Sequence, residues 1–285
     1  MYYRSISMTK IEQLKKRPKI FRRLTGLTIE KYDEIYPKLE ELYAEFNSKR
    51  LDRKGRKRRI GGGNQFRLCL EDRLLMLLMY YRLYVPHIFL GFLFGIDDSN
   101  VGRNINPLQP LLAKIFTIPE RKIDLSENEI LELFIDGTEQ TINRPKKGQR
   151  KWYSGKKKKH TIQHQVIVTK TGTIKGVGKS SYGKTHDKKD YENKKFVIDP
   201  KVKRTGDLAY LGTGMTVPIK KKKGKKLTKE EKLYNRQLAS VRVVVEHTIG
   251  KMKIFRILSE RFRNPLKDHN LIFKNIAGIH NLMFA

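Results

Sequence analysis

The segment Leu131-Glu132-Leu133-Phe134-Ile135-Asp136-Gly137-Thr138 limits how this chain can fold more than any other. A short apolar run of this kind predicts a buried strand over Leu131–Asp136, with Asp136 at its carboxyl end. A carboxylate in that place, beside a flexible glycine, can hold a metal ion. The simpler interpretation is that Asp-Gly only starts a turn. The rest of the chain decides between the two.

The chain is strongly basic. It has 285 residues, and 62 Lys and Arg against 29 Asp and Glu give a net charge of +33. Such a surface repels itself unless a polyanion neutralises it, so DNA or RNA is the first expected partner and an anionic membrane the second. Ribosomal and chromosomal proteins share this composition, and charge alone therefore identifies no reaction.

Cysteine content and hydropathy narrow the class of protein. The single cysteine, Cys69, excludes a disulfide framework and a cysteine-based zinc site, and we expect it to be a small core residue. Met1–Ser5 lacks the apolar segment of a signal peptide. The most hydrophobic run, Leu74–Val85, is too short to cross a bilayer and contains Arg82. We therefore expect a soluble, cytoplasmic protein without a membrane partner.

The first part of the chain is predicted to be helical. Residues 1–27 are basic with little periodicity, and we expect an arm there. Thr28 can cap a helix whose apolar residues recur at helical spacing, and residues 50–63 form a basic, glycine-rich linker.

A three-helix pattern follows. Leu70–Leu83 is an apolar helix, Pro86 fits the first position of a second helix that Gly95 ends, and Asp98 or Ser99 can cap a third. In the third helix we expect Val101 and Ile105 to face inward, and Asn100, Arg103 and Asn104 to face outward. This order is typical of a helix-turn-helix with the third helix reading DNA. The alternative is an ordinary helical bundle. Pro107 and Pro110 are expected to disturb helicity beyond it.

The second half mixes strands and helices, which predicts an α/β or α+β core. The expected elements, in order, are strands at His160–Thr169 and Thr173–Val177 joined by a Thr171-Gly172 turn, a short helix within His186–Phe196, a strand at Val202–Asp207, a long helix from the Thr228/Glu231 capping box past Gly250, and a closing helix at Leu266–Phe284.

Three carboxylates stand where they can meet. Asp136 and Asp207 each follow a predicted strand, and Glu246 lies on the long helix. Magnesium prefers oxygen ligands, and two such ions about 3.5–4 Å apart can activate a nucleophile and stabilise the leaving oxygen in phosphodiester chemistry.

The long helix carries a polar face beside an apolar one. At ~100° per residue, Arg242, Gly250 and Lys253 fall within about 40° of Glu246. The core stripe comprises Leu238, Val241, Val245, Ile249 and Met252. Gly250 costs the helix roughly 1 kcal/mol relative to alanine and would let a phosphate backbone approach. The alternative is an Arg242–Glu246 surface pair with Lys253 solvated.

These residues resemble the DDE-type transposases of bacterial insertion sequences, closest to the insertion-sequence-five group. The resemblance runs from about residue 70 to the end. It is carried by Phe134-Ile135-Asp136-Gly137-Thr138-Glu139, Arg144-Pro145, Tyr153-Ser154-Gly155 with Lys156 to His160, Gly206-Asp207 with Tyr210 and Gly212, and Val243-Val244-Val245-Glu246-His247 with Ile249, Gly250 and Lys253.

The resemblance implies a ribonuclease H-like catalytic core with an N-terminal helix-turn-helix domain. Asp136, Asp207 and Glu246 would be the catalytic ligands of Mg²⁺ or Mn²⁺, with two ions bound. Relatives carry a Tyr-x2-Arg-x3-Glu-x6-Lys signature, and Ala239 takes the tyrosine position here, which puts any role of that tyrosine in doubt. The implied division is an arm, helix and linker at 1–63, a helix-turn-helix domain at 64–125 and a catalytic domain at 126–285.

The expected partner is double-stranded DNA, both transposon terminal repeats and target, bound by a homo-oligomer associated with the nucleoid. Arg242 and Lys253 would contact phosphates near the cut. The other expected DNA contacts are Arg103 and Asn104 on the recognition helix, Lys156, Lys157, Lys158 and Lys159, and Trp152, which either stacks on an unpaired base or simply packs. Glu139 and Asp187 are weaker carboxylate candidates, and we do not expect His160, His164 or His186 to be metal ligands.

The implied reaction is attack of metal-activated water on a phosphodiester at a transposon end, followed by attack of the freed 3′-hydroxyl on target DNA. Two other functions remain open. One is a noncatalytic DNA-binding regulator derived from a transposase. The other is a ribonuclease H-like nuclease without strand transfer.

Overall fold

The computed structural model describes residues 9–52, 55, 65–123, 125 and 132–284. It divides into two compact units. The first comprises residues 1–116 with 255–257, and the second comprises residues 117–254 with 258–285. The described residues are helical in the first unit and mixed in the second, so the mixed α/β class is confirmed. The division at 63/64 and 125/126 stays a prediction. No helix in the described ranges is long and apolar enough to span a bilayer.

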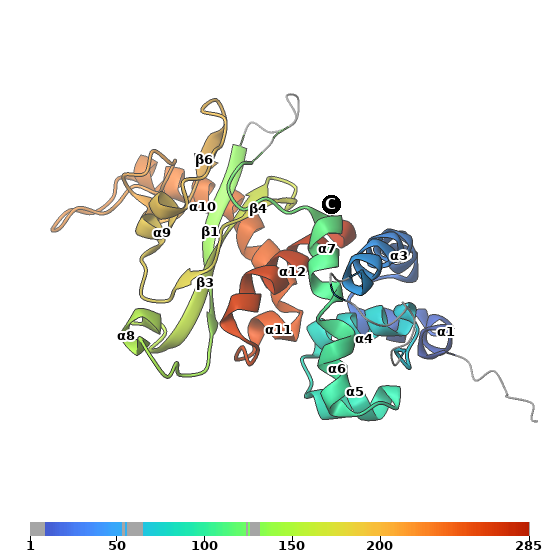
Figure 1. The fold of residues 1–285 in the computed structure, drawn as a ribbon. Helices are drawn as coiled ribbons and strands as arrows, with labels where there is room; N and C mark the ends of the chain where they lie inside the picture. The colour runs from blue at the N-terminus through green and yellow to red at the C-terminus, as the bar shows by residue number, and fades with distance from the viewer. Residues whose placement is uncertain (1–8, 53–54, 56–64, 124, 126–131, 285) are drawn as a thin grey trace, which may run out of the picture. The chain divides into compact units, whose positions relative to one another are not determined.

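The first unit contains seven helices among its described residues (Figure 1). They are α1 (Lys10–Lys15), α2 (Pro18–Thr25), α3 (Ile29–Leu51), α4 (Leu70–Leu83), α5 (His87–Phe94), α6 (Asp98–Ile105) and α7 (Leu108–Phe116). The expectation of an arm over residues 1–27 is wrong from Lys10 onward. Thr9 and Glu12 form a capping box that starts α1, and Ile11 and Phe21 are fully buried. Helices as short as α1 and α2 have too few turns for their apolar residues to show a clear helical period in the sequence. Most of the expected linker, and Met1–Ser5, lie outside the described residues.

The three-helix pattern of α4, α5 and α6 is confirmed. Gly95 ends α5 in the left-handed conformation, at φ +67°. Pro86 precedes α5 as its N-cap rather than opening it, and Asp97 caps α6 instead of Asp98 or Ser99. Pro107 and Pro110 do not prevent helix α7, because Pro110 falls in its first turn, where no backbone N–H is needed.

Two side chains in this unit differ from expectation. Asn104 is buried rather than facing outward, and its Nδ2 donates to the Asn100 carbonyl at 2.8 Å. Its own carbonyl accepts from the buried Arg73 guanidinium, which ties α6 to α4. Cys69 is exposed, not in the core, because it lies before α4 as the N-cap, with Sγ accepting from the Asp72 N–H.

The second unit is built on a six-stranded sheet. Its strands are β1 (Glu132–Thr141), β2 (Tyr153–Ser154), β3 (Lys159–Thr169), β4 (Ile174–Val177), β5 (Ser181–Tyr182) and β6 (Lys203–Thr205). The central order is β2-β3-β1-β6, and β4 and β5 also pair with β3. β1 is antiparallel to β3 and parallel to β6.

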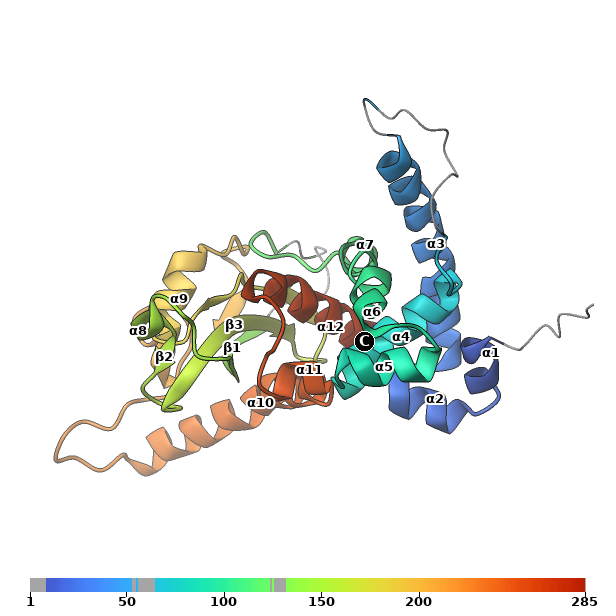
Figure 2. The same ribbon diagram turned by 60° about the horizontal axis from the view of Figure 1, so that its bottom comes forward.

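Helices cover this sheet. They are α8 (Gln149–Trp152), α9 (Asp187–Lys194), α10 (Lys229–Lys253), α11 (Arg256–Ser259) and α12 (His269–Phe284), with 3-10 turns at Leu208–Tyr210 (η1) and Leu266–Asp268 (η2). Figure 2 shows α10 lying along β1 and β3, and α10 packs against both strands. The Thr228/Glu231 capping box, the turn at Gly172 and the closing helix are confirmed.

The first strand is longer than predicted. β1 continues five residues beyond Asp136 to Thr141, because the polar stretch Gly137–Thr141 keeps pairing with β3 as far as Thr161. Asp136 therefore lies within the strand rather than at its end. Leu131, the predicted first residue, lies outside the described residues. Backbone pairing to a neighbouring strand, not side-chain hydropathy, extends this strand.

One hydrophobic cluster packs on the face of β1 that carries Leu133 and Ile135. These two side chains, with Ile167 of β3, meet Tyr191 of α9 and Tyr210 of η1. On α10, Leu238, Val245, Ile249 and Met252 are buried as expected, whereas Val241 is exposed at 36% and lies outside the core. Thr248 takes its place in the buried stripe.

A buried pair of histidines joins β3 to α12. His164 Nδ1 donates to the Gly178 carbonyl at 2.9 Å, its Nε2 lies 2.9 Å from His269 Nδ1, and His269 Nε2 lies 2.8 Å from Gln140 Oε1. Burial lowers the pKa of His164 and lowers the pKa of His269 to about 3. The folded pair therefore resists taking up two protons.

This burial predicts that the second unit loses stability in mild acid. Both unfolded histidines titrate near 6.5, so below that pH the unfolded chain binds more protons than the folded chain. Stability therefore falls by about 2 kcal/mol for each histidine, or about 4 kcal/mol for the pair, between pH 7 and 5. The measurement is urea unfolding across that range in an Asp136→Asn chain, because protonation of Asp136 changes stability in the opposite sense. Replacing the exposed His247 by glutamine should leave the curve unchanged. A flat pH profile would contradict the prediction.

Candidate active site

The pairing of β1 with β6 brings two of the predicted carboxylates together. Phe134 pairs with Thr205 in parallel register, and Asp136 and Asp207 each lie two residues beyond that pair. Neighbouring strands are about 4.8 Å apart, so the two aspartates come from adjacent backbone segments. Glu132, two residues before Phe134 on β1, helps to hold this register. Its Oε1 accepts from Thr205 Oγ1 at 2.7 Å and lies 2.9 Å from Lys203 Nζ.

Asp136 is a half-buried carboxylate with few partners. Burial, together with the charges of Asp207 and Asp187, raises the pKa of Asp136 to about 6. Its Oδ1 accepts from the neighbouring Gly137 N–H at 2.8 Å, and among the described residues no cationic side chain forms an ion pair with it. A buried anion in this state either takes up a proton or binds a cation. The donors at hand are oxygens, which suits magnesium.

A third aspartate lies near this pair. Strand alternation points Gly137 away from Asp136, toward the face that α9 covers. Asp187 Oδ1 occupies the space there, 2.7 Å from where a Cβ at residue 137 would lie. The pKa of Asp187 is raised by burial and by Asp207. From the sequence, Asp187 ranked below the other three carboxylates. Only Gly137, a residue without a side chain, signalled that another group packs closely on β1.

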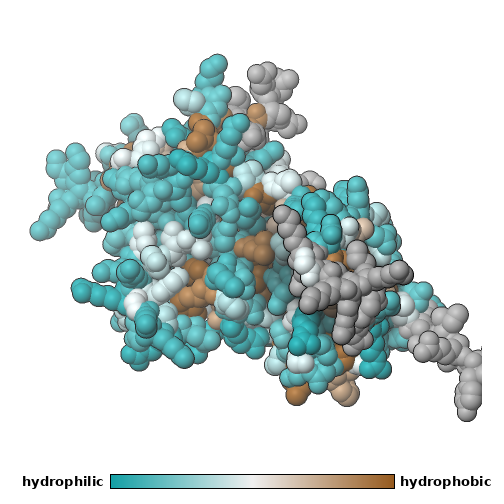
Figure 3. All heavy atoms as spheres, in the orientation of Figure 1, coloured by the Kyte–Doolittle hydropathy of each residue, from teal (hydrophilic) through white to brown (hydrophobic). Residues whose placement is uncertain are grey.

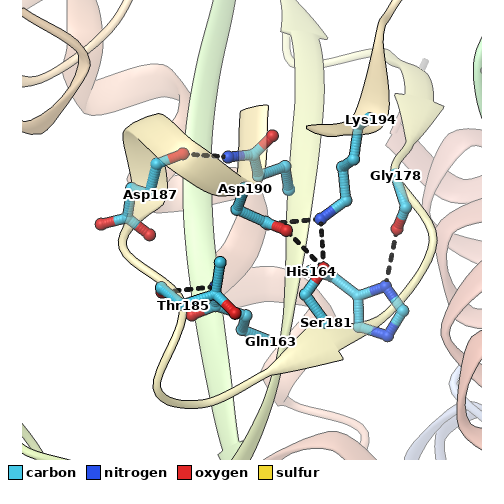
Figure 4. A network of polar contacts seen from close by, with 9 residues as sticks. Gln163, His164, Gly178, Ser181, Thr185, Asp187, Asp190 and Lys194 are labelled. Atoms are coloured by element: carbon cyan, nitrogen blue, oxygen red, sulfur yellow. Dashed lines mark hydrogen bonds and ion pairs between the residues drawn. The ribbon is translucent and has the colours of Figure 1, made fainter. Parts of the chain in front are cut away.

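Helix α9 holds Asp187 in place through its own buried contacts (Figure 4). Asp190 and Lys194, one turn apart and both buried, form an ion pair, and both contact Ser181 on β5. The backbone carbonyl of Asp187 accepts from Gln165 Nε2 at 2.8 Å. These contacts fix α9 to β3 and β5. They do not use the Asp187 carboxylate, which stays near Asp136 and Asp207.

Tyr210 lies among these carboxylates. Its ring is fully buried against Gly206, where a Cβ would come within 2.8 Å of it. The hydroxyl is buried without a hydrogen-bond partner among the described residues, and burial and the charges of Asp187 and Asp136 raise its pKa. An unpaired buried hydroxyl beside three aspartates is a group that a bound water or ion could satisfy.

The polar face of α10 meets this site in part. The charge of Arg242 lowers the pKa of Asp136, and Arg242 Nε is buried without a partner among the described residues. Lys253 is half-buried, and burial and Lys157 lower its pKa while Asp136 and Glu139 raise it. Glu246 itself is exposed. Across the described ranges, no group of three or more carboxylate, histidine or cysteine side chains is arranged to hold one metal ion. The structure thus joins Asp136 and Asp207, and leaves Glu246 apart from them.

The remaining predicted DNA contacts lie on the surface. Arg103 is exposed on α6. Lys156, Lys157 and Lys158 are exposed between β2 and β3, and Lys159 is exposed as the first residue of β3. Trp152 is partly buried and packs edge-on against Tyr182, with ring centroids 4.6 Å apart. Much of the visible surface is hydrophilic (Figure 3).

The comparison with known families matches this arrangement. A family model described as DDE superfamily endonuclease matches residues 135–281, and one described as helix-turn-helix of DDE superfamily endonuclease matches residues 66–118. The chain belongs to the DDE superfamily of endonucleases. The first match spans β1, β6 and α10, which carry the three predicted carboxylates, and the second spans α4–α6. The expected family is confirmed.

Two relatives support the same family. A protein of Microchaete diplosiphon, named as a transposase for insertion sequence element IS702, is 36% identical over 233 residues, which cover 78% of this chain and 84% of that protein. A protein of Streptomyces albus G, named as a transposase for insertion sequence element IS112, is 29% identical over 230 residues, covering 77% and 82%. No solved structure matches the chain.

The close approach of Asp187 to Gly137 predicts that Gly137→Ala disturbs this site. The new methyl carbon would lie 2.7 Å from Asp187 Oδ1, which is closer than van der Waals contact allows. We therefore expect the unfolding free energy to fall by about 1–3 kcal/mol. Thermal unfolding measures it. Gly155→Ala is the matched control, since a Cβ there meets nothing within 4 Å. Equal melting temperatures for the two variants would contradict the placement of Asp187.

Proposed function

We propose that this protein is a DNA transposase, which binds the terminal repeats of an insertion sequence, cleaves there in a metal-dependent reaction and joins the end to target DNA. The observation that carries the proposal is the parallel β1–β6 pairing that sets Asp136 beside Asp207. Membership of the DDE endonuclease superfamily and the names of the relatives support it.

The fold proposed for the second unit is ribonuclease H-like. Its support is a central strand, β1, flanked by an antiparallel β3 and a parallel β6, with α10 packed on β1 and β3. This topology brings the carboxylates from separate elements to one region of the sheet. The sequence between Asp207 and Glu246 is short, which leaves no room for a large inserted domain.

Asp136 and Asp207 are the residues proposed to hold divalent metal, Mg²⁺ or Mn²⁺ and two ions in the full complex. When bound, the metal supplies a Lewis acid for activating water and for stabilising the leaving oxygen of a phosphodiester. Asp136 contributes a half-buried carboxylate without an ion-pair partner among the described residues, and Asp187 adds negative charge from the α9 side. The chain itself contributes positioning and charge stabilisation.

Glu246 is proposed as the third catalytic carboxylate. It lies on the same helix as Arg242 and Lys253, which are both within electrostatic reach of Asp136. Its exposed position requires that DNA and metal draw it toward the aspartates. Arg242 and Lys253 would then contact the phosphate that is cut. Related enzymes have a tyrosine at the position of Ala239, and alanine has no side-chain group that can form a hydrogen bond.

DNA binding is proposed to use both units. In the helical unit, α6 presents Arg103 toward bases, while the buried Asn104 fixes α6 to α4 and would reach DNA only if it left that position. In the sheet unit, Lys156, Lys157, Lys158 and Lys159 would follow phosphates, with Trp152 beside them. A homo-oligomer would bring two ends together, at the nucleoid.

The first functional prediction concerns Asp136. Asp136→Ala should reduce cleavage of the element's own flanking DNA to background, and leave end binding unchanged, because it removes a metal ligand but no DNA contact. The measurement is mapping of cut positions in Mg²⁺, with chelator as a second control. Lys201→Ala, an exposed change away from the site, should cleave normally. Full cleavage by Asp136→Ala in magnesium would refute the assignment.

The same substrates separate the two other functions. A noncatalytic regulator would bind ends and never nick supercoiled DNA, with or without metal. A nuclease without strand transfer would cut but fail to join a pre-cut end to a target plasmid.

A second functional prediction concerns Gly250. A Cβ at Gly250 meets nothing within 4 Å in the protein, so Gly250→Ala should stabilise α10 by roughly 1 kcal/mol. If DNA backbone packs there, the same change should lower cleavage. Ser240→Ala, on another face of α10, should also favour the helix but leave cleavage unchanged. A variant that is both more stable and fully active would show that DNA does not approach Gly250.

A further inference from the structure

A cleft of about 920 Å³ opens in the second unit, beyond the carboxylates. Its walls come from the α8–β2 segment, the start of β3, β5 and α9. Figure 2 shows α8, β2 and α9 close together. No carboxylate is among the described residues that line it. Five of them are cationic, namely Arg144, Arg150, Lys151, Lys184 and Lys189. The cleft is therefore electropositive without an internal counter-charge, although the chain places aspartates nearby on the same helix α9.

Aromatic rings form the other part of the lining. Tyr153 and Tyr182 are each 45% exposed, which is unusual for large rings in a concave surface, and His160 packs edge-on to Tyr153. Trp152 packs edge-on against Tyr182, and Lys151 Nζ lies 5.8 Å from the centre of the Tyr182 ring. Partly exposed, supported rings between cations are the arrangement that binds unpaired nucleotides, since bases stack and phosphates meet the cations.

We infer that this cleft binds an unpaired DNA strand, with Tyr153 and Tyr182 as the stacking residues and Trp152 as the support for Tyr182. The inference rests on the proposed function and adds to it a second DNA site, distinct from the carboxylates. It also changes the role expected of Trp152, whose ring is turned against Tyr182 rather than left open.

The geometry sets the length of strand that would connect the two sites. Asp136 pairs with Val166, and His160 lies six residues from Val166 along β3, a distance of ~20 Å. At a rise of ~3.4 Å per nucleotide, this is about six stacked nucleotides. A DNA end held at the carboxylates therefore reaches the cleft only when roughly that many bases are unpaired. The exposed rings of Tyr153 and Tyr182 favour a frayed or single-stranded end over a blunt duplex, because only unpaired bases can stack on them.

The test uses the full chain in chelator, so that its result does not depend on cleavage. Fluorescence anisotropy compares a duplex with an unpaired end of twelve nucleotides, one with an end of two, and a blunt duplex. Ends longer than about six nucleotides should bind several-fold more tightly than the others. The Tyr153→Ala/Tyr182→Ala variant should lose this advantage, by at least about fivefold in Kd, and bind the blunt duplex as before.

Two controls separate stacking from general effects. Tyr153→Phe/Tyr182→Phe keeps the rings and should bind as the unmodified chain does. Tyr234→Ala removes a ring of similar exposure on α10, outside the cleft, and should change nothing. If the alanine variant weakens blunt and unpaired DNA equally, the cleft is only a general phosphate-binding surface, and the inference fails.

A crosslink gives an independent result. An end carrying 5-iodouracil six to eight nucleotides from the duplex should crosslink to Tyr153, Tyr182 or His160, located by mass spectrometry of the digested protein. Crosslinks confined to other residues would overturn the inference. Neither assay contains metal, so both report on DNA binding by the cleft and not on cleavage. The Asp136→Ala cleavage experiment above tests the carboxylate site separately.

Discussion

The parallel pairing of β1 with β6 is the contact on which the rest of the second unit depends. Only three residue pairs form it, and β6 is short, so backbone hydrogen bonds alone hold it weakly. Glu132 strengthens it through Thr205 and Lys203. A slip of one residue would turn Asp207 away from Asp136, because strand side chains alternate between faces. The register of these three pairs thus decides whether the two aspartates, 71 residues apart in the sequence, lie on adjacent backbone segments.

Gathering carboxylates in one place opposes folding, and the structure shows how the cost is met. Burial raises the pKa of Asp136 and of Asp187, and the negative charges of the neighbouring aspartates add to both rises. The buried Asp190–Lys194 pair fixes α9, and Arg242, Lys253 and Lys156 lie within electrostatic reach. A chain with +33 net charge can keep such an acidic cluster because its surroundings are strongly positive. The unpaired hydroxyl of Tyr210 is a remaining polar group at this cluster.

Most elements of the fold could be predicted from local chemistry. α4 begins and ends at the expected residues, Gly95 stops α5, and Thr228 with Glu231 starts α10, because caps, periodicity and glycine act within a few residues. The errors have a common cause in contacts from elsewhere in the chain. Ile11 and Phe21 are buried by tertiary packing that the short sequences of α1 and α2 do not predict. Asn104 is held by a hydrogen bond from Arg73, and pairing with β3 lengthens β1.

The sequence by itself determined the family and the basic character that suits a polyanionic partner, since motif order and net charge are written in the residues. It also singled out Asp136 and Asp207 as candidate metal ligands. Tertiary structure alone decided which groups meet. It set Asp187 over Gly137, joined Asp136 to Asp207, left Glu246 exposed on α10, and formed an electropositive cleft from Tyr153, Tyr182 and cations of four separate segments. The physical reason is that burial, register and charge proximity are properties of pairs of segments, whereas a motif describes only one.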